Sequence, residues 1–138
     1  MHRHLAAAKP RFNGRVGFLQ IPVPLNKACN PHVTRDSEKH RDACELAALA
    51  LAVWRSQPAK FEEYHNWLMK DDHPPAVTDA RAAAEQLIGT EQLIAQLGDP
   101  QLSGRIAVGG QLYKLARFGS IPKLLLPNAV ITGRAATE

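Results

Sequence analysis

The segment from Gly119 to Gly133 constrains the fold most, because it consists of two short apolar runs joined by a Pro-Asn turn. Ile121-Pro122 precedes the first run. This pattern predicts a β-hairpin that is entered through an X-Pro bond. Since proline lacks the N–H group that a central ladder needs, Pro122 is expected at the first position of a strand or at a sheet edge. An X-Pro bond also adopts the cis form at low cost, so both isomers are open here.

The size of the chain is that of one domain. Its 138 residues are enough to build a hydrophobic core. The longest apolar run, from Leu46 to Trp54, is too short to span a bilayer, and the residues after Met1 do not form a signal peptide. No membrane span and no export signal are therefore expected in this sequence.

The formal net charge is +4, and the basic residues are scattered along the chain. Only Arg105, Lys114 and Arg117 approach a helical stripe, and neither a helix-turn-helix nor an RNA-binding signature accompanies them. We therefore expect these side chains to form a solvated surface, and we expect no nucleic-acid partner.

The first part of the chain is expected to form a helix, a strand and a loop. Residues 2–8 are rich in Ala and contain no β-branched residue, which favours a helix. Arg15 to Val23 is an apolar run typical of a buried strand, and Pro22 ends it. Leu25 to Asp36 contains an Asn-Pro turn signal and is predicted to be a loop.

Helical patterns dominate the middle of the chain. Ser37 is a candidate N-cap for a helix whose apolar residues recur from Leu46 to Trp54, and this helix is expected to stop near Gln57, before Pro58. Four further helical segments are predicted, and Thr90 is the candidate N-cap of the third of them. These segments are Ala59–Met69, Thr78–Ile88, Glu91–Leu97 and Pro100–Phe118.

Two details of these helices are expected from residue type. Glycines weaken the last segment by about 1 kcal/mol each relative to alanine, which favours a break near Gly109. The segment after Pro58 is expected to bury its large apolar side chains, namely Phe61, Tyr64, Trp67 and Leu68. The whole order of helix, strand, helix cluster and hairpin predicts an α/β fold in a single domain, 1–138, with a helical insertion over about 37–118.

Four places in this order match a known family. They are Met1–Leu5, Val16–Leu25, Ala43–Ala50 with Phe61–His65, and Ile121-Pro122. Their order resembles that of the DsbA-like thioredoxin-fold protein disulfide oxidoreductases. In that family they would be the helix after a Cys-x-x-Cys, the second strand, the start of a helical insertion and the cis-proline loop. The resemblance implies extended or unfolded polypeptide substrates, no cofactor and an extracytoplasmic, periplasmic-type location.

The chain departs from the family pattern at both ends. The Cys-x-x-Cys and the first strand would precede Met1, and Ala135 to Glu138 would only begin the last helix. The resemblance therefore implies an incomplete thioredoxin-like domain that is inactive in thiol–disulfide exchange, and it leaves open whether the chain is an enzyme. The missing strand would lie between the strands of Val16 and Pro122. Two sheet edges would then be unpaired and open to another segment, a partner strand or self-association.

The resemblance also assigns roles to four residues. Ile121 and Pro122 would bind the substrate backbone, whereas no catalytic residue is carried over because the redox motif is absent. Since the family is exported, Cys29 and Cys44 are expected to form a structural disulfide. Such a bridge contributes about 3 kcal/mol in the chain-entropy description. Two free thiols are the alternative in a reducing compartment.

Two other functions remain open. The first is a small zinc-stabilised domain, because Cys29, His32, His40 and Cys44 provide a tetrahedral set of ligands. Exposed histidines in a charged loop are the simpler interpretation of the same residues. The second is a non-catalytic binding module that holds an extended peptide by strand addition at the Ile121-Pro122 edge.

Overall fold

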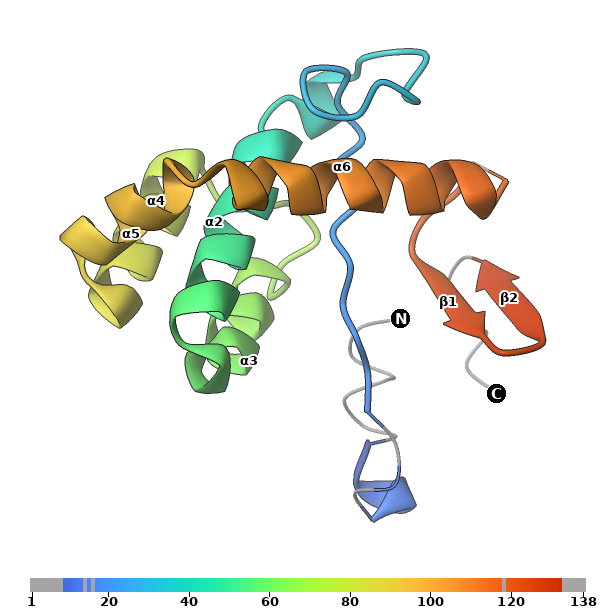
Figure 1. Ribbon diagram of the computed structural model, residues 1–138, viewed down its shortest axis with the longest axis horizontal. Helices are drawn as coiled ribbons and strands as arrows, with labels where there is room; N and C mark the ends of the chain where they lie inside the picture. The colour runs from blue at the N-terminus through green and yellow to red at the C-terminus, as the bar shows by residue number, and fades with distance from the viewer. Residues whose placement is uncertain (1–8, 14, 16, 118, 133–138) are drawn as a thin grey trace. The chain divides into compact units, whose positions relative to one another are not determined.

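The computed structural model describes residues 9–13, 15, 17–117 and 119–132 (Figure 1). The chain divides into two compact units, one of residues 22–113 and one of residues 1–21 together with 114–138. Helices occur together with a two-stranded antiparallel sheet, so the mixed helix-and-sheet composition expected for an α/β chain is confirmed. Within the described residues, no helix is both long enough and apolar enough to cross a membrane.

The unit of residues 22–113 is helical. A short 3-10 helix, η2 (Glu38–His40), precedes the first α-helix, and Pro58 at the start of α3 separates α2 from α3. Gly89 lies between α4 and α5. The α-helices are α2 (Ala43–Ser56), α3 (Pro58–Leu68), α4 (Val77–Ile88), α5 (Thr90–Leu97) and α6 (Pro100–Leu115), of which α6 ends in the other unit.

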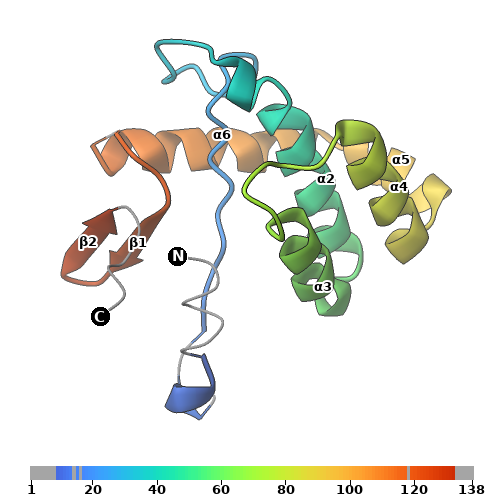
Figure 2. The same cartoon turned by 180° about the vertical axis from the view of Figure 1, so that it is seen from behind.

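The core of this unit surrounds α2, which packs against α3, α4 and α5 (Figure 2). Leu49 and Val53 of α2 are buried, as their helical spacing predicts. The hydroxyl of Tyr64 in α3 donates a hydrogen bond to the carbonyl of Ala80 in α4, at 2.8 Å. The other buried apolar residues are Leu51, Ala52, Leu68, Ala80, Ala84, Ile88, Leu93, Leu102 and Ile106.

The five helical segments predicted between residues 37 and 118 are confirmed, but their ends differ. The predicted N-caps are wrong, because Asp42 rather than Ser37 precedes α2, and Gly89 precedes α5, of which Thr90 is the first residue. Ser37 instead precedes the 3-10 helix η2.

Two further details of the prediction are wrong. Trp67 is 38% exposed, because α3 packs only through the side that carries Tyr64 and Leu68. The last helix is not broken near Gly109, since α6 continues through Gly109 and Gly110, both of which are buried.

The second unit contains the predicted hairpin. Strand β1 (Lys123–Leu126) pairs antiparallel with β2 (Ala129–Thr132), and the two-residue turn is Pro127-Asn128. Leu124 lies opposite Ile131 and Leu125 opposite Val130. The hairpin expected from the two apolar runs and the Pro-Asn turn is therefore confirmed.

The N-terminal part of this unit differs from the prediction. The strand expected over Arg15–Val23 is wrong, because residue 15 and residues 17–23 are assigned to no strand. Leu19 is 79% exposed rather than buried. Within the described part of the chain, this apolar segment has no neighbouring strand that could supply its backbone hydrogen bonds, and a strand requires such a neighbour. A 3-10 helix, η1 (Lys9–Phe12), precedes the segment, and the helix expected over 2–8 lies outside the described residues.

Candidate functional site

The two residues expected to bind substrate, Ile121 and Pro122, stand at the entrance to β1. Both are exposed, and the peptide bond between them is cis. Pro122 comes directly before Lys123, the first residue of β1, so its missing N–H removes nothing from the ladder. Gly119 has a φ of +80°, a backbone conformation that favours glycine, and it redirects the chain between α6 and this proline.

The hairpin carries apolar side chains on both faces. Opposite residues of an antiparallel pair share a face, so Leu124 and Ile131 lie on one side of the sheet and Leu125 and Val130 on the other. Ile131 is 43% exposed and Val130 is 53% exposed. Strands with two apolar faces are typical of sheets that are covered on both sides. The hairpin therefore has the surface of an internal sheet element, yet both of its faces remain accessible.

Within the described part of the chain, the outer edge of β1 has no pairing strand. Among the described residues, β2 is the only strand that pairs with β1, so the sheet ends at β1 on one side. In an antiparallel ladder, alternate residues direct their N–H and C=O groups away from the paired strand. Half of the backbone groups of Lys123–Leu126 therefore point to an edge that another extended chain can occupy.

A disulfide joins Cys29, in the loop before α2, to Cys44, the second residue of α2. This is the pair expected from the resemblance. Asn26 holds the ends of the loop together. Its Nδ2 donates to the carbonyl of Arg41 at 2.7 Å, and its Oδ1 accepts a hydrogen bond from the backbone N–H of Ala28 at 2.8 Å. Loop and helix are thus connected by one covalent bond and by side-chain hydrogen bonds.

Asn30, in the same loop, is fully buried and was missed by the sequence analysis. Its Nδ2 donates to the carbonyl of Pro24 at 2.9 Å, and its Oδ1 accepts from the backbone N–H of His32 at 3.2 Å. Its side chain lies against Gly110 of α6. Two sequence features mark this contact, namely the Asn-Pro pair at 30–31 and the adjacent glycines Gly109 and Gly110 in a helical segment. Neither feature indicates that Asn30 and Gly110 meet in the fold.

The structure does not support the zinc alternative. Cys29 and Cys44 are both consumed by the disulfide, so neither sulfur is a thiolate that binds zinc. In the described ranges of the chain, no three side chains of the His, Cys, Asp or Glu type gather closely enough to hold a metal ion. His32 and His40 are partly buried residues of the loop and of η2.

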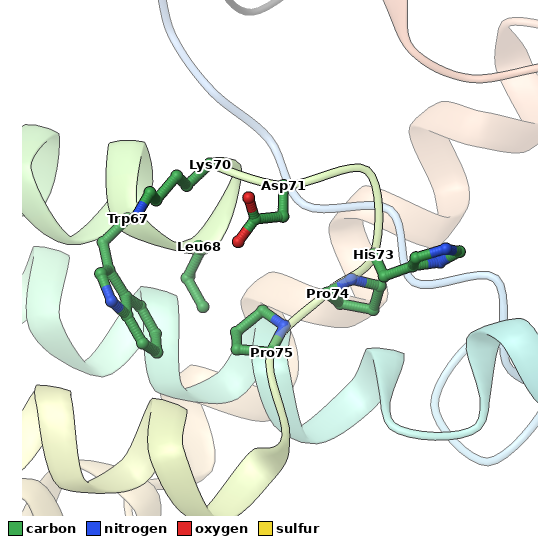
Figure 3. A pocket seen from close by; sticks show the side chains of 7 residues that line it. All are labelled: Trp67, Leu68, Lys70, Asp71, His73, Pro74 and Pro75. Carbon is green, nitrogen blue, oxygen red and sulfur yellow. The ribbon is translucent and has the colours of Figure 1, made fainter.

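A pocket of about 270 Å³ lies at the C-terminal end of α3 and in the loop that leads to α4 (Figure 3). Leu68 belongs to its lining, and Trp67, Lys70, Asp71, His73, Pro74 and Pro75 complete it. Figure 3 shows the imidazole of His73 pointing away from the carboxylate of Asp71. The two groups therefore do not form the carboxylate–imidazole pair that acid–base catalysis would use.

The residues singled out from the sequence belong to different units. Ile121 and Pro122 lie with the hairpin, whereas Cys29 and Cys44 lie in the helical unit. The hairpin edge offers backbone groups and apolar side chains, and the disulfide fastens a loop to a helix. A comparison of the chain with protein-family models, with curated proteins and with solved structures finds no match.

Proposed function

We propose that this chain is a non-catalytic binding module that holds an extended polypeptide along the outer edge of β1. The observation that carries the proposal is this edge, which begins directly after Pro122 and has no pairing strand among the described residues. Strand addition to an exposed sheet edge is a recurrent mode of peptide recognition. Main-chain hydrogen bonds supply the affinity, and alternate side chains supply the specificity.

The bound polypeptide would extend the two-stranded sheet to three strands. The new ladder would begin at Lys123, the first residue of β1. Side chains of the ligand would alternate between the two faces of the sheet. They would pack beside Leu124 and Leu126 on one face and beside Leu125 on the other. The exposed leucine side chains of β1 would then gain apolar neighbours on both faces of the sheet.

The proposal excludes thiol–disulfide exchange through a redox motif. The chain contains two cysteines and no Cys-x-x-Cys. Exchange of that type needs a thiolate at a helix N-terminus and a second cysteine one turn away, which resolves the mixed disulfide. Cys44 lies in the first turn of α2, but the other cysteine, Cys29, lies in the preceding loop, so no second cysteine follows Cys44 one turn further along the helix. In an insulin-reduction assay with dithiothreitol, we expect the purified chain to give no rate above the background.

A DsbA-like thioredoxin domain is the second candidate. Part of the order of the described elements favours it, because five α-helices precede a hairpin that begins directly after Pro122, although residues 17–23, where the family order has a strand, form none. Under this candidate, the polypeptide bound at β1 would take the place of the central strand of the family's sheet. Measurable insulin reduction by the chain alone would contradict both candidates, since each predicts a module without turnover.

Backbone N-methylation tests the binding mode. The probe is a fluorescein-labelled nonapeptide of alternating Val and Thr, titrated with the full chain and followed by fluorescence anisotropy. Strand addition requires every second N–H of the peptide, so methylation of one central amide should abolish binding and methylation of its neighbour should not. The neighbouring peptide is the matched control. Equal affinity of the two methylated peptides, or no binding of the parent peptide, would refute strand addition.

A further inference from the structure

Charge is divided unevenly between the two units. Residues 1–21 and 114–138 contain eight Lys and Arg against one Glu, a net charge of +7. Residues 22–113 contain nine Lys and Arg against twelve Asp and Glu, a net charge of −3. The two values add up to the +4 of the whole chain. The basic residues are scattered along the sequence, but the fold concentrates their excess in the unit that contains the hairpin.

Every charged residue in the described part of this unit is a Lys or an Arg. Lys114 and Arg117 are exposed, and Lys123 is partly exposed as the first residue of β1. Arg117 precedes Lys123 by six residues, which limits the separation of their Cα atoms to about 21 Å. The described part of the unit contains no carboxylate, and the whole unit has one Glu against eight Lys and Arg, so an acidic ligand would supply the missing negative charge.

We propose that the polypeptide bound at β1 is an acidic one, with apolar residues that pair along the edge and carboxylates that flank them. This inference rests on the proposed function and names its class of ligand. The apolar residues would cover Leu125 and Val130, and the flanking Asp or Glu side chains would face Lys123 and the basic end of α6. Complementary charge of this kind raises the association rate and excludes partners of the wrong sign.

The chemistry of the edge favours a polypeptide over the other anionic partners. A lipid bilayer would leave the outward N–H and C=O groups of β1 without hydrogen-bond partners, which is costly in hydrocarbon. A single-stranded nucleic acid would find no aromatic side chain in β1 or β2 on which to stack a base. A second copy of this chain would bring another unit of charge +7 to the same edge, and the two units would repel each other.

Three peptides with one central sequence test the inference. Each carries the Val/Thr nonapeptide, flanked at both ends by Glu-Glu, Ser-Ser or Lys-Lys, and its Kd for the full chain is measured by fluorescence anisotropy. We expect the Glu peptide to bind about tenfold more tightly than the Lys peptide at about 20 mM ionic strength. The ratio should fall towards one in about 0.5 M NaCl, because salt screens exposed charges.

A charge variant assigns the effect to the hairpin unit. Lys114→Gln, Arg117→Gln and Lys123→Gln combined should remove most of the preference for the Glu peptide. The matched control is Lys39→Gln, Lys60→Gln and Arg81→Gln combined, which removes the same net charge from exposed positions of the helical unit. We expect the control to retain the preference. An equal loss in both variants would show that overall charge, rather than the hairpin unit, causes the discrimination, and it would overturn the inference.

The remaining outcomes separate the two proposals. Equal binding of all three peptides would overturn the acidic ligand and leave the peptide-binding module in place. If none of the three binds, both proposals fail. Tighter binding of a 15-residue oligothymidine, or of vesicles of phosphatidylserine and phosphatidylcholine, than of the Glu peptide would identify a different anion as the partner and overturn the inference.

Discussion

A Cβ atom added at Gly110 would lie 3.0 Å from Oδ1 of Asn30, closer than side chains normally approach. Asn30 cannot retreat easily, because it is fully buried and its side chain is hydrogen-bonded to Pro24 and His32. Gly110 therefore allows α6 to pass directly over the loop that is fastened to α2. The glycine that weakens the helix by its intrinsic propensity is the residue that permits this packing.

This contact predicts opposite effects for two substitutions in the same helix. Gly110→Ala should destabilise the chain by about 1–3 kcal/mol, because overpacking against Asn30 exceeds the gain in helix propensity. Gly104→Ala is the matched control, since nothing lies within 4 Å of a Cβ atom at that position. It should stabilise the chain by up to about 1 kcal/mol. Urea denaturation measures both values, and stabilisation by Gly110→Ala would contradict the packing argument.

The disulfide should contribute to stability without being needed for the fold of the helices. Replacing both Cys29 and Cys44 by Ser should lower the free energy of unfolding by about 3 kcal/mol, because the open chain gains conformational freedom. Dithiothreitol should lower the urea midpoint of the unmodified chain to about that of the variant and leave the midpoint of the variant unchanged. A response of the variant to dithiothreitol, or no response of the unmodified chain, would contradict this role.

Tyr64 makes the free energy of unfolding depend on pH in the alkaline range. Burial raises the pKa of its hydroxyl above the ordinary value of about 10, so the unfolded chain ionises first as pH rises. The contribution of Tyr64 is fully present below about pH 10 and is lost progressively above it. Tyr64→Phe should lower the free energy of unfolding by about 1 kcal/mol at pH 7, because the hydrogen bond to Ala80 is lost. Urea denaturation between pH 8 and pH 11 should then give a shallower decline for the variant, and identical slopes would contradict the prediction.

Asp99 links the end of α2 to the start of α6. Its carboxylate accepts hydrogen bonds from the backbone N–H of Gln101 and from the guanidinium of Arg55. These contacts lower its pKa, the bond from Gln101 first and that from Arg55 second. Its contribution to stability is therefore present above the unfolded pKa of about 3.9 and is lost as pH falls through the lower pKa of the folded state.

Asp99→Asn tests this acid dependence, since the amide oxygen keeps an acceptor for Gln101 but carries no charge. The variant should have a lower Tm than the unmodified chain at pH 7, and the difference should shrink towards pH 3. Thermal unfolding followed by circular dichroism measures this. As a control, Asp79→Asn changes a carboxylate in the first turn of α4 and leaves the contacts of Arg55 and Gln101 intact. A difference between Asp99→Asn and the unmodified chain that does not vary with pH would contradict the assignment.

The helices and the hairpin were predictable because their signals are local. Apolar spacing from Leu46 to Trp54 indicates a helix whatever surrounds it, and Pro58 separates α2 from α3 by its own geometry. The hairpin likewise depends on two adjacent runs and the Pro127-Asn128 turn between them. Each of these elements finds its hydrogen-bond partners within a few residues or within its own pair of strands.

Local residues could not determine whether Arg15–Val23 forms a strand. An apolar run becomes a strand only where a neighbouring strand pairs with it, and the described residues supply none. The break predicted near Gly109 failed for a related reason. Helix propensity favoured the break, whereas the burial of Gly109 and Gly110, the latter against Asn30 of the loop, favoured continuation, and burial prevailed.

The amino-acid sequence by itself determined the helical segments, the hairpin and the absence of a Cys-x-x-Cys motif, since these follow from neighbouring residues. Only the tertiary structure decided that Asn30 meets Gly110, that Cys29 bonds to Cys44 and that the excess of positive charge gathers in the unit of the hairpin. Such relationships join residues far apart in the chain. They arise when the folded backbone brings residues far apart in the chain together, and local sequence patterns do not predict such contacts.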